Sequence, residues 1–424
     1  MKTKNILLIS LLLLTLYACK DVHEQYRNYT ANVPKYLSYA ELRNSVKVTA
    51  AKPIDSIGKI YIKGNYLFVN EIYKGVHVFD NTDPTAPKNI AFYNIPGNVD
   101  MAIKGNYLYA DSYIDLVVLD ISNINAAKEI YRVKDIFSYT IPTCDYKYPI
   151  SEIDKSKGVI TSWKVERVEQ KITSNTYPYY YYDKGMETFL LNADAKSGAQ
   201  IVGIGGSLAR FIIKDNYLYG VNNNNLQVIN IQNSTQPSVG SSIPLARIAE
   251  TLFVENNVLF IGTQTGMLIY DIKEGSIPQL ISTFNHFKSC DPVVVQNGYA
   301  YITLRQGNRC GNWQNVFQIV DIHVLNSPQL VKSYPLTSPY GLGIDNKTLF
   351  ICDGNAGLKI YDVTDPLRAD ENLIKAYPHV KAFDVIPLQK SLILMAADGI
   401  YQYNYADLSN IKEISKIPIS ALKY

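Results

Sequence analysis

Most of the chain after residue 45 consists of short runs in which apolar residues alternate with polar ones or follow one another, separated by turn-forming residues. Such runs are typical of strands, and no segment shows a sustained helical period. One kind of run ends in Asp or Asn and occurs seven times, with its last residue at Asp80, Asp120, Asn230, Asp271, Asp321, Asp362 and Asn404. Four of the six spacings are 40 to 42 residues, so the chain is a repeat with a period near 41.

A second feature recurs in each repeat, a tight turn followed by an apolar strand. The turn is Gly64–Asn65 in the first repeat, Gly105–Asn106 in the second and Asp215–Asn216 in the third. These residue types adopt the positive φ that a two-residue hairpin requires. In the first repeat, the pattern predicts four strands, at 59–62, 66–69, 76–79 and 89–93.

Four strands per repeat and seven repeats indicate an all-β protein, a β-propeller of seven four-stranded blades. Six blades stay an alternative, because the seventh repeat has Gln389–Lys390 in place of the Gly–Asn turn and because Asn230 and Asn404 replace the usual Asp. Residues 411–419 supply the fourth strand of the last blade. We predict that residues 46–50 form an outer strand that pairs near the last blade and ties the ring shut.

The longest spacing, 110 residues, is one period plus an insertion between blades two and three, about residues 139–207. Residues 158–172 alternate well enough to predict a hairpin within this long inserted loop. In a four-stranded meander, the links from strand two to strand three lie on the same face as the links between blades. We call this face, on which strand one of each blade begins, the link face, and we predict that the insertion rises from it.

The run at 117–121, Val-Val-Leu-Asp-Ile, and its partners in the other repeats resemble the LVIVD repeat. The resemblance covers about residues 58–420. It implies a propeller of the kind found in secreted or lipid-anchored bacterial proteins. It implies no catalytic residue, because the repeat carries no established activity.

The N-terminus has the pattern of a secretory signal, with basic residues up to Lys4 and an apolar stretch from Ile6 to Leu16 that is too short to span a bilayer. The tetrapeptide Leu16-Tyr17-Ala18-Cys19 resembles a bacterial lipobox, which is cleaved before the Cys.

The lipobox resemblance implies a signal peptide at 1–18 and a lipoprotein that carries diacylglycerol and palmitate on Cys19. It also implies an outer-membrane location, on the periplasmic or the cell-surface side, with the lipid anchor as the sole membrane contact. An ordinary signal peptide with a chance Cys is the alternative. We interpret the polar stretch 19–44 as a tether and 45–424 as the propeller.

Composition limits the class of partner. The net charge is +3 and falls to +1 without Lys2 and Lys4, so the chain has no electrostatic footprint for nucleic acid. Tyrosine is unusually frequent, with 34 copies against 13 Phe and 2 Trp. Tyrosine favours strands and half-wet surfaces, which agrees with a sheet protein that has a polar partner.

Two cysteines fall on the link face of the fifth blade. Cys290 precedes its first strand, and Cys310 lies in the link between its second and third strands. An exported protein meets an oxidising compartment, so we predict a Cys290–Cys310 disulfide. Two free or metal-binding thiols are the alternative, although no CxxC or nearby His pair completes a zinc site. Cys352 lies in an apolar strand and is interpreted as a core thiol.

Aromatic residues gather in the link-face insertions. Their density suits stacking and hydrogen bonding to a sugar, peptide or protein surface. The alternative is that the tyrosines cover a small core of the insertion itself. The candidate contact residues are Trp163, Tyr179, Tyr180, Tyr181, Tyr182 and Trp313.

Charged residues occur at the ends of the inner strands. Asp100 and Asp291 precede the first strands of blades two and five, and Glu71, Asp111 and Arg305 follow second strands. We predict that they line the channel opening, where carboxylates bind a cation or basic ligand and Arg binds a carboxylate. The alternative is that they satisfy backbone groups of turns and of neighbouring blades.

No nucleophile–base or zinc signature appears, and the resemblance supplies no cofactor. We therefore predict a non-catalytic binding or scaffold propeller, without cofactor or metal, that presents an aromatic-rich face to a glycan or an envelope protein. One alternative is a propeller hydrolase or lyase acting on an envelope or extracellular polysaccharide, with carboxylates such as Asp100 and Asp111 as acid and base. Another is a structural member of an envelope assembly that uses the blade edges.

Overall fold

The structure of the chain is a computed structural model that describes residues 26–139, 141–171, 192–193, 204–207, 210–222, 224–285, 292–306 and 314–419. The chain divides into two compact units. The first combines the N-terminal residues up to Tyr36 with Pro142–Ser156 and Ile160–Tyr182. The second contains the rest of the chain and holds the repeats.

The first unit is a two-stranded sheet of β1 (Tyr26–Leu37) and β11 (Val159–Lys171). Tyr29 contacts Gln170 while Lys35 contacts Thr161, so the two strands run antiparallel. The predicted hairpin at 158–172 is therefore wrong, because this segment is one long strand whose partner lies within the predicted tether. A partner more than 100 residues away leaves no local signal in either segment.

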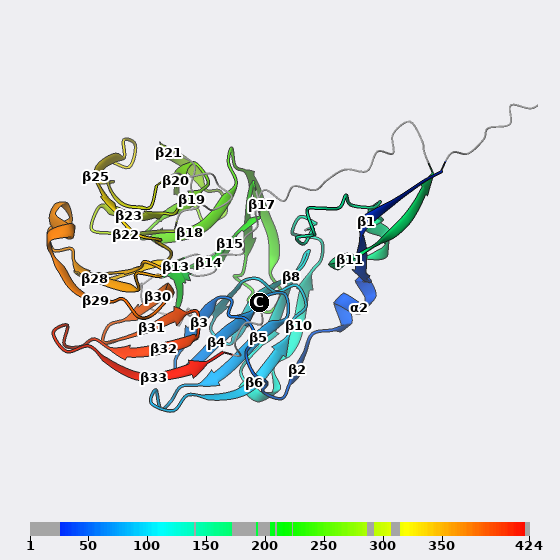
Figure 1. Cartoon of the computed structure of the whole chain (residues 1–424), viewed down its shortest axis with the longest axis horizontal. Coiled ribbons are helices and arrows are strands. Elements are labelled where there is room, and N and C mark those ends of the chain that lie inside the picture. The colour runs from blue at the N-terminus through cyan, green and yellow to red at the C-terminus, as the bar shows by residue number, and fades with distance from the viewer. Residues whose placement is uncertain are drawn as a thin grey trace, which may run out of the picture. The chain divides into compact units, whose positions relative to one another are not determined.

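The second unit is a seven-bladed β-propeller, as the sequence predicted (Figure 1). Each blade is an antiparallel sheet whose four strands follow one another in sequence. Blades 1 to 3 are β3 (Ile60–Lys63), β4 (Tyr66–Glu71), β5 (Gly75–Asp80), β6 (Lys88–Asn94); β7 (Met101–Lys104), β8 (Tyr107–Ser112), β9 (Asp115–Asp120), β10 (Lys128–Val133); and β14 (Phe211–Lys214), β15 (Tyr217–Asn222), β16 (Asn225–Asn230), β17 (Ser238–Pro244).

The other four blades follow the same plan. They are β18 (Ala249–Glu255), β19 (Val258–Thr263), β20 (Gly266–Asp271), β21 (Gln279–Asn285); β22 (Val293–Gln296), β23 (Tyr299–Leu304), β24 (Val316–Asp321), β25 (Gln329–Pro335); β26 (Leu342–Asp345), β27 (Thr348–Cys352), β28 (Leu358–Asp362), β29 (Leu373–Tyr377); and β30 (Ala382–Leu388), β31 (Ser391–Ala396), β32 (Gly399–Asn404), β33 (Lys412–Pro418).

Helix is scarce in the described residues. The α-helix α2 (Tyr39–Asn44) begins at a capping box in which Ser38 and Glu41 bond each other's backbone N–H groups. Its Leu42 is buried against Ile114 of blade 2. The short 3-10 turns are η2 (Ile124–Ala126), η3 (Lys155–Lys157) and η4 (Pro366–Glu371). No helix in the described ranges is long and apolar enough to cross a membrane.

The Asp or Asn that ends each third strand has one structural task. In all seven blades its side-chain oxygen accepts a hydrogen bond from the backbone N–H two residues later, which closes the turn toward strand four. The task needs only an acceptor oxygen, so Asn230 and Asn404 perform it as well as Asp. The Asn residues, which kept a six-bladed ring as an alternative, therefore do not change the turn. The ring has seven blades.

The tight turn between strands one and two also keeps its backbone shape in the aberrant repeat. Gly64 and Gly105 take a φ of 55° and 56°, and Gln389 in the seventh blade takes 61°. A non-glycine residue in this region is strained, and the surrounding hairpin holds it there. The seventh turn thus has the same backbone shape as the others, at a higher conformational energy.

Hydroxyl groups join each blade to the next. At every one of the seven interfaces a Tyr or Ser hydroxyl donates to a backbone carbonyl in the following blade, in the loop between its third and fourth strands; Tyr93 does so at 2.7 Å and Tyr219 at 2.8 Å. The pairs are Tyr93–Ile124, Tyr109–Ser234, Tyr219–Gly275, Ser282–Leu325, Tyr334–Leu367, Tyr377–Ile411 and Ser415–Pro84. Part of the tyrosine excess therefore belongs to the scaffold.

The ring closes by packing between blades 7 and 1. Ile393 and Ile417 of blade 7 share an apolar cluster with Ile62 and Leu67 of blade 1. The strand predicted at residues 46–50 does form, as β2 (Lys47–Thr49). It pairs with β6 as a fifth, outer strand of blade 1. The prediction that it pairs near the last blade was wrong, because the last repeat already supplies all four strands of its own blade.

Part of the insertion lies at the centre of the ring. β12 (Asn192–Ala193) pairs with β13 (Ile204–Ser207), and β13 pairs with the innermost strand of blade 1, β3. β13 also contacts β18, β26 and β30, the innermost strands of blades 4, 6 and 7. The prediction that the insertion simply rises from the link face is therefore wrong for this part, which enters the channel.

Gln402 is a polar residue at a third-strand position that is apolar in the other blades, and it helps to close the ring between blades 7 and 1. Two residues before the turn-closing Asp or Asn, the other six third strands carry Val or Ile, and the seventh carries Gln402. Its amide exchanges two hydrogen bonds with Asn81 of blade 1, at 2.7 and 3.0 Å. Gln402 is only 2% exposed.

We expect Gln402→Ala to lower the free energy of unfolding by about 2 kcal/mol, because it removes these bonds and leaves the half-buried Asn81 amide without them. Urea denaturation of the full chain measures the change. The matched control is Gln318→Ala in the third strand of blade 5, where the side-chain oxygen is buried and has no hydrogen-bond partner among the described residues. Equal losses from both variants would show that the amide pair does not help to close the ring.

Candidate functional site

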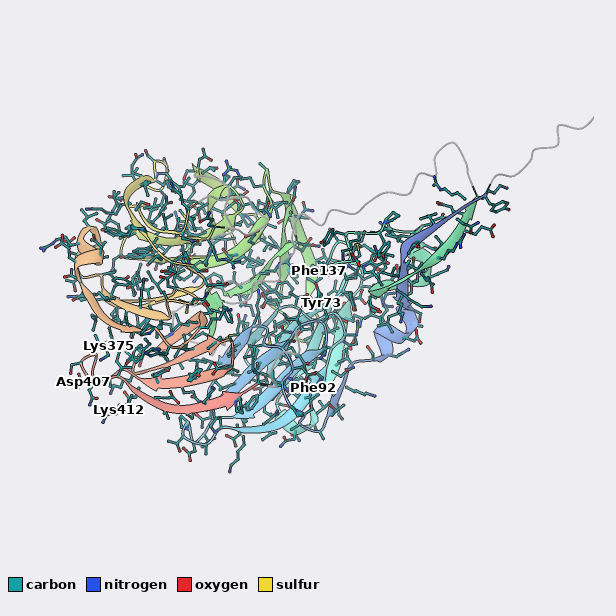
Figure 2. The ribbon with its side chains drawn as sticks, in the orientation of Figure 1. Tyr73, Phe92, Phe137, Lys375, Asp407 and Lys412 are labelled. Carbon is teal, nitrogen blue, oxygen red and sulfur yellow. The ribbon has the colours of Figure 1, made fainter. Side chains whose placement is uncertain are left out.

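A small pocket of about 40 Å³, partly open to solvent, lies on the link face where blades 1, 2 and 3 meet. Figure 2 labels Tyr73 and Phe137, two of the residues that line it. We call it the link-face pocket. It is lined by Tyr73, Gly97, Val99, Asp100, Asp111, Tyr113, Phe137, Arg210, Phe211, Val221 and Asn222.

The structure brings two predicted site residues, Asp100 and Asp111, into this pocket, and their roles differ. Asp100 is 1% exposed, and both of its oxygens are occupied. One accepts from the backbone N–H of Met101 at 2.7 Å. The other accepts from the ammonium group of Lys59 at 3.0 Å and from the backbone N–H groups of Arg210 and Phe211. Asp100 therefore ties blades 1, 2 and 3 together.

Asp111 keeps one oxygen available. Its Oδ1 accepts three hydrogen bonds, from the side chain of Asn98 at 2.9 Å and from the backbone N–H groups of Val99 and Asp100 at 2.8 and 2.9 Å. Its Oδ2 has no partner among the described residues and is not sealed from solvent. Burial of the carboxyl raises the pKa of Asp111 to about 6, against these hydrogen bonds.

Two tyrosines form a stacked wall of the pocket. The rings of Tyr73 and Tyr113 lie 6.4 Å apart, centre to centre, and 8° from parallel. Both residues have a positive φ, 61° and 56°, which is strained for a side chain of this size. Tyr73 is held by hydrogen bonds from its N–H to Asn98 and to its carbonyl from Gly97.

Gly97 is required at this wall. It has a φ of 78°, and a Cβ there would lie 2.2 Å from the ring of Tyr113. The glycine thus lets the Tyr113 ring pack directly on the backbone of the link between blades 1 and 2. Burial and the neighbouring Tyr73 raise the pKa of Tyr113 to about 12, so the hydroxyl keeps its proton at neutral pH.

Another part of the pocket lining is apolar. Phe137 follows the last strand of blade 2, and its N–H donates to the carbonyl of Ile114 at 2.9 Å. This bond holds the ring of Phe137 over that of Phe211, with centres 5.5 Å apart. The pocket is therefore bounded by aromatic rings from all three blades.

Arg210 and Asn222 supply hydrogen-bond donors that sequence reasoning missed. One nitrogen of the Arg210 guanidinium donates to the carbonyl of Val221 at 3.2 Å. In the described part of the chain, the rest of this guanidinium and the Asn222 amide have no hydrogen-bond partner. A signal for Arg210 was present in the repeat, since it stands directly before the first strand of blade 3, as Lys59 and Asp100 do in blades 1 and 2.

Glu71 is a buried structural group. Its oxygens accept from Lys74 at 2.6 Å and from His77 and Lys52, both at 2.9 Å. Burial alone would raise its pKa, but these hydrogen bonds outweigh burial and lower the pKa of Glu71 to about 2. Glu71 thus fits the predicted alternative, in which such residues satisfy neighbouring groups of the fold.

The remaining predicted residues lie elsewhere. Arg305 stacks on the ring of Tyr340 at 4.2 Å, in a separate cluster on blades 5 and 6. Trp163 belongs to the first unit, where its indole N–H donates to Pro142. The buried Cys352 lies in β27, as expected of a core thiol. Outside the described residues fall Cys19, Tyr179, Tyr180, Tyr181, Tyr182, Cys290, Asp291, Cys310 and Trp313.

A second hollow lies at the rim, between β2 and β10, and is lined by Val48, Ile90 and Lys128 among others. It is open and lacks the enclosed carboxylate of the link-face pocket. In the ranges that the structure describes, no three His, Cys, Asp or Glu side chains gather in a group that could hold a metal ion.

The family described as the LVIVD repeat matches residues 97–135, 205–243 and 288–335, which cover blade 2, blade 3 up to residue 243 and blade 5. The chain thus carries LVIVD repeats at three places and folds as a seven-bladed propeller. The resemblance seen in the sequence is therefore confirmed. Curated protein sequences contain no match to the chain.

Solved structures resemble this chain in fold alone. The computationally designed protein Ika8 has a TM-score of 0.51 at 9% identity, covering 89% of this chain and 92% of that chain. PorZ, a surface component of the type-IX secretion system of Porphyromonas gingivalis, has a TM-score of 0.49 at 10% identity, covering 88% of this chain but only 39% of PorZ. BamB from Moraxella catarrhalis has a TM-score of 0.47 at 7% identity, covering 84% of this chain and 96% of that chain.

We expect Asp111→Asn to stabilise the fold at pH 7.5 but not at pH 4. The pKa of Asp111 is raised in the folded chain, so its ionisation between about pH 4 and pH 6 costs stability, at most about 3 kcal/mol. Asparagine keeps an acceptor oxygen and removes that cost. Urea denaturation at a series of pH values measures the difference.

The control for this experiment is Asp120→Asn, because Asp120 closes an exposed turn and its hydrogen bonds to Ser122 lower its pKa. Relative to the unaltered chain, this control variant should not become more stable as the pH rises from 4 to 7.5. A stability difference between Asp111→Asn and the unaltered chain that stays constant from pH 4 to pH 7.5 would contradict the account of Asp111.

Proposed function

We propose that this chain is a non-catalytic binding propeller of the bacterial envelope that presents its link face to a glycan or an envelope protein. The observation that carries the proposal is the link-face pocket. It combines aromatic walls with polar groups, on Asp111, Arg210 and Asn222, that the described part of the fold does not use. Concave sites that are largely aromatic and carry a few polar groups are typical of ligand binding.

The geometry favours binding over glycan hydrolysis. A hydrolase of this class needs two carboxyl groups that face the scissile bond. Asp111 has an available oxygen, but both oxygens of Asp100 are occupied by Lys59 and by backbone donors. Glu71 is likewise occupied by its three partners. Of these three described carboxylates, Asp111 alone has an available oxygen, whereas the polysaccharide hydrolase or lyase alternative needs two reactive carboxyl groups.

The anchoring half of the proposal rests on the sequence. The short apolar stretch and the lipobox ending at Cys19 support export and lipid attachment at the outer membrane. In the same compartment, Cys290 and Cys310 would form a disulfide, and Tyr179, Tyr180, Tyr181, Tyr182, Asp291 and Trp313 would extend the binding face. These parts of the proposal concern residues outside the described ranges.

We expect Cys19→Ser to release the protein from membranes. In bacteria labelled with radioactive palmitate, the unaltered chain should carry label and sediment with the outer membrane, while the variant carries none. Substitution of Lys20, next to the modified residue, serves as the matched control and should leave labelling intact. A labelled Cys19→Ser protein, or an unlabelled unaltered chain, would contradict lipid attachment at Cys19.

We expect the double variant Arg210→Ala, Asn222→Ala to lose most partner capture from solubilised envelope, because both donors of the link-face pocket are removed. Affinity capture with the lipidated full chain, followed by analysis of bound glycans and proteins, measures the loss. Arg368→Ala is the control, since Arg368 lies in an exposed loop between third and fourth strands and pairs only locally with Glu371. Equal capture by both variants would argue for a partner site on the blade edges.

A further inference from the structure

We propose that the outer rim of blades 3 to 6 is a self-association surface, through which two copies of this chain pair and leave their link faces free. The inference goes beyond the proposed function, because it concerns a surface away from the link-face pocket. This surface consists of the outer strands and of the loops between third and fourth strands. In a four-stranded meander, these loops lie on the face of the ring opposite the link face.

Apolar side chains occur at one repeated position of this rim. On the fourth strand of every blade, one residue pairs with the residue before the turn-closing Asp or Asn, next to a shift in register. In blades 3 to 6, this residue is apolar and about half exposed: Val239, Leu280, Leu330 and Leu373. In blades 7, 1 and 2, it is polar: Glu413, Asn89 and Glu129. One side of the ring is therefore apolar at a position where the other side is polar.

Exposed apolar residues of the loops lie between these strands. Ile277, Val324 and Leu367, in the loops between third and fourth strands of blades 4, 5 and 6, are 40 to 62% exposed. A hydroxyl of the preceding blade's outer strand bonds each loop at or next to this residue; the pairs are Ser241–Ser276, Ser282–Leu325 and Tyr334–Leu367. Figure 1 shows the outer strands β21, β25 and β29 one after another along the rim. We call the four strand residues and these three loop residues the apolar arc.

The apolar arc holds most of the exposed apolar side chains of the ring. In the described part of the second unit, nine large apolar residues are strongly exposed, and seven of them belong to the arc. Single exposed apolar residues are common on protein surfaces, whereas a row of them is typical of an interaction surface. Helices that lie on a membrane surface combine aromatic with basic side chains. The arc is aliphatic throughout, which favours a protein partner over a lipid surface.

The charges around the apolar arc fit a second copy of this chain. Residues 231–244 of blade 3 contain no charged side chain. In the loops of blades 4 and 5, Lys273 and His323 each bond the Asp that closes their own turn. Glu274 of blade 4 and Lys332 of blade 5 are exposed and have no ion-pair partner in the described ranges. A two-fold axis between these blades exchanges them, so that Glu274 of each copy faces the blade that carries Lys332 of the other. An apolar centre flanked by unlike charges is therefore complementary to itself.

Pairing through the rim has a consequence for binding. The link face of each copy stays open, because the apolar arc lies on the outer strands and on loops of the opposite face. One pair of chains then presents two link faces. Two linked faces bind a repeating glycan or an assembled partner more tightly than either face alone, without any new contact.

Sedimentation equilibrium of the purified full chain in a density-matched detergent tests the pairing. We expect the mass to rise from that of one chain to that of two as the protein concentration increases. The double variant Leu280→Glu, Leu330→Glu should weaken this association at least tenfold. The blade accepts the change, since Glu129 and Glu413 occupy the same position in blades 2 and 7. Ile130→Glu is the matched control, because Ile130 is 40% exposed on the outer strand of blade 2, away from the arc, and it should leave the association unchanged.

A charge exchange distinguishes a second copy from any other partner. Lys332→Glu should weaken the association about threefold to fivefold, because like charges then face each other across the two-fold axis. The further change Glu274→Lys in the same chain should restore it, which only contact of the arc with itself predicts. A mass of one chain at every concentration, association that survives the double Leu variant, or a Lys332→Glu loss without rescue would overturn the inference. Binding of the arc to neutral phosphatidylcholine vesicles in place of self-association would overturn it in favour of a lipid surface.

Discussion

The structure depends on one repeated interaction, the hydrogen bond from a side-chain hydroxyl of one blade to a backbone carbonyl of the next. Apolar packing between blades is strong but non-directional, so it does not by itself fix how far one sheet is rotated against its neighbour. A directed bond at each of the seven interfaces does. The carbonyl always lies in the loop that follows the turn-closing Asp or Asn, which explains why the end of the third strand is the most regular part of the repeat.

The link-face pocket differs from the rest of this scaffold because Asp111 has an oxygen that no described group of the fold binds. Lys59, Asp100 and Glu71 are charged, buried and paired, as buried charges in stable folds are. Asp111 is enclosed but keeps an oxygen toward the pocket, at a cost to stability that its raised pKa reflects. Two tyrosines beside it are held in strained backbone conformations. This cost without structural return is the reason that we propose a binding role for the pocket.

The sequence was sufficient for the period, the blade count and the position of Asp111, because these follow from residues that recur at fixed spacing. It was insufficient where one part of the chain depends on a distant part. β1 has its partner more than 100 residues away, β2 joins the first blade and not the last, and β13 enters the channel. Tyr73 and Tyr113 were detectable in principle, since both occupy the link from strand two to strand three, 40 residues apart. Their stacking is a contact between blades that no single repeat contains.

The central claim is that the ring meets its partner at the link face of blades 1 to 3. Hydrogen–deuterium exchange of the full chain, with and without a solubilised envelope fraction, tests it most directly. The account predicts slowed exchange in the links around Tyr73, Gly97, Tyr113 and Asn222, with the rim strand β2 unchanged. Protection confined to β2 and β10, or to the loops between third and fourth strands, would contradict it.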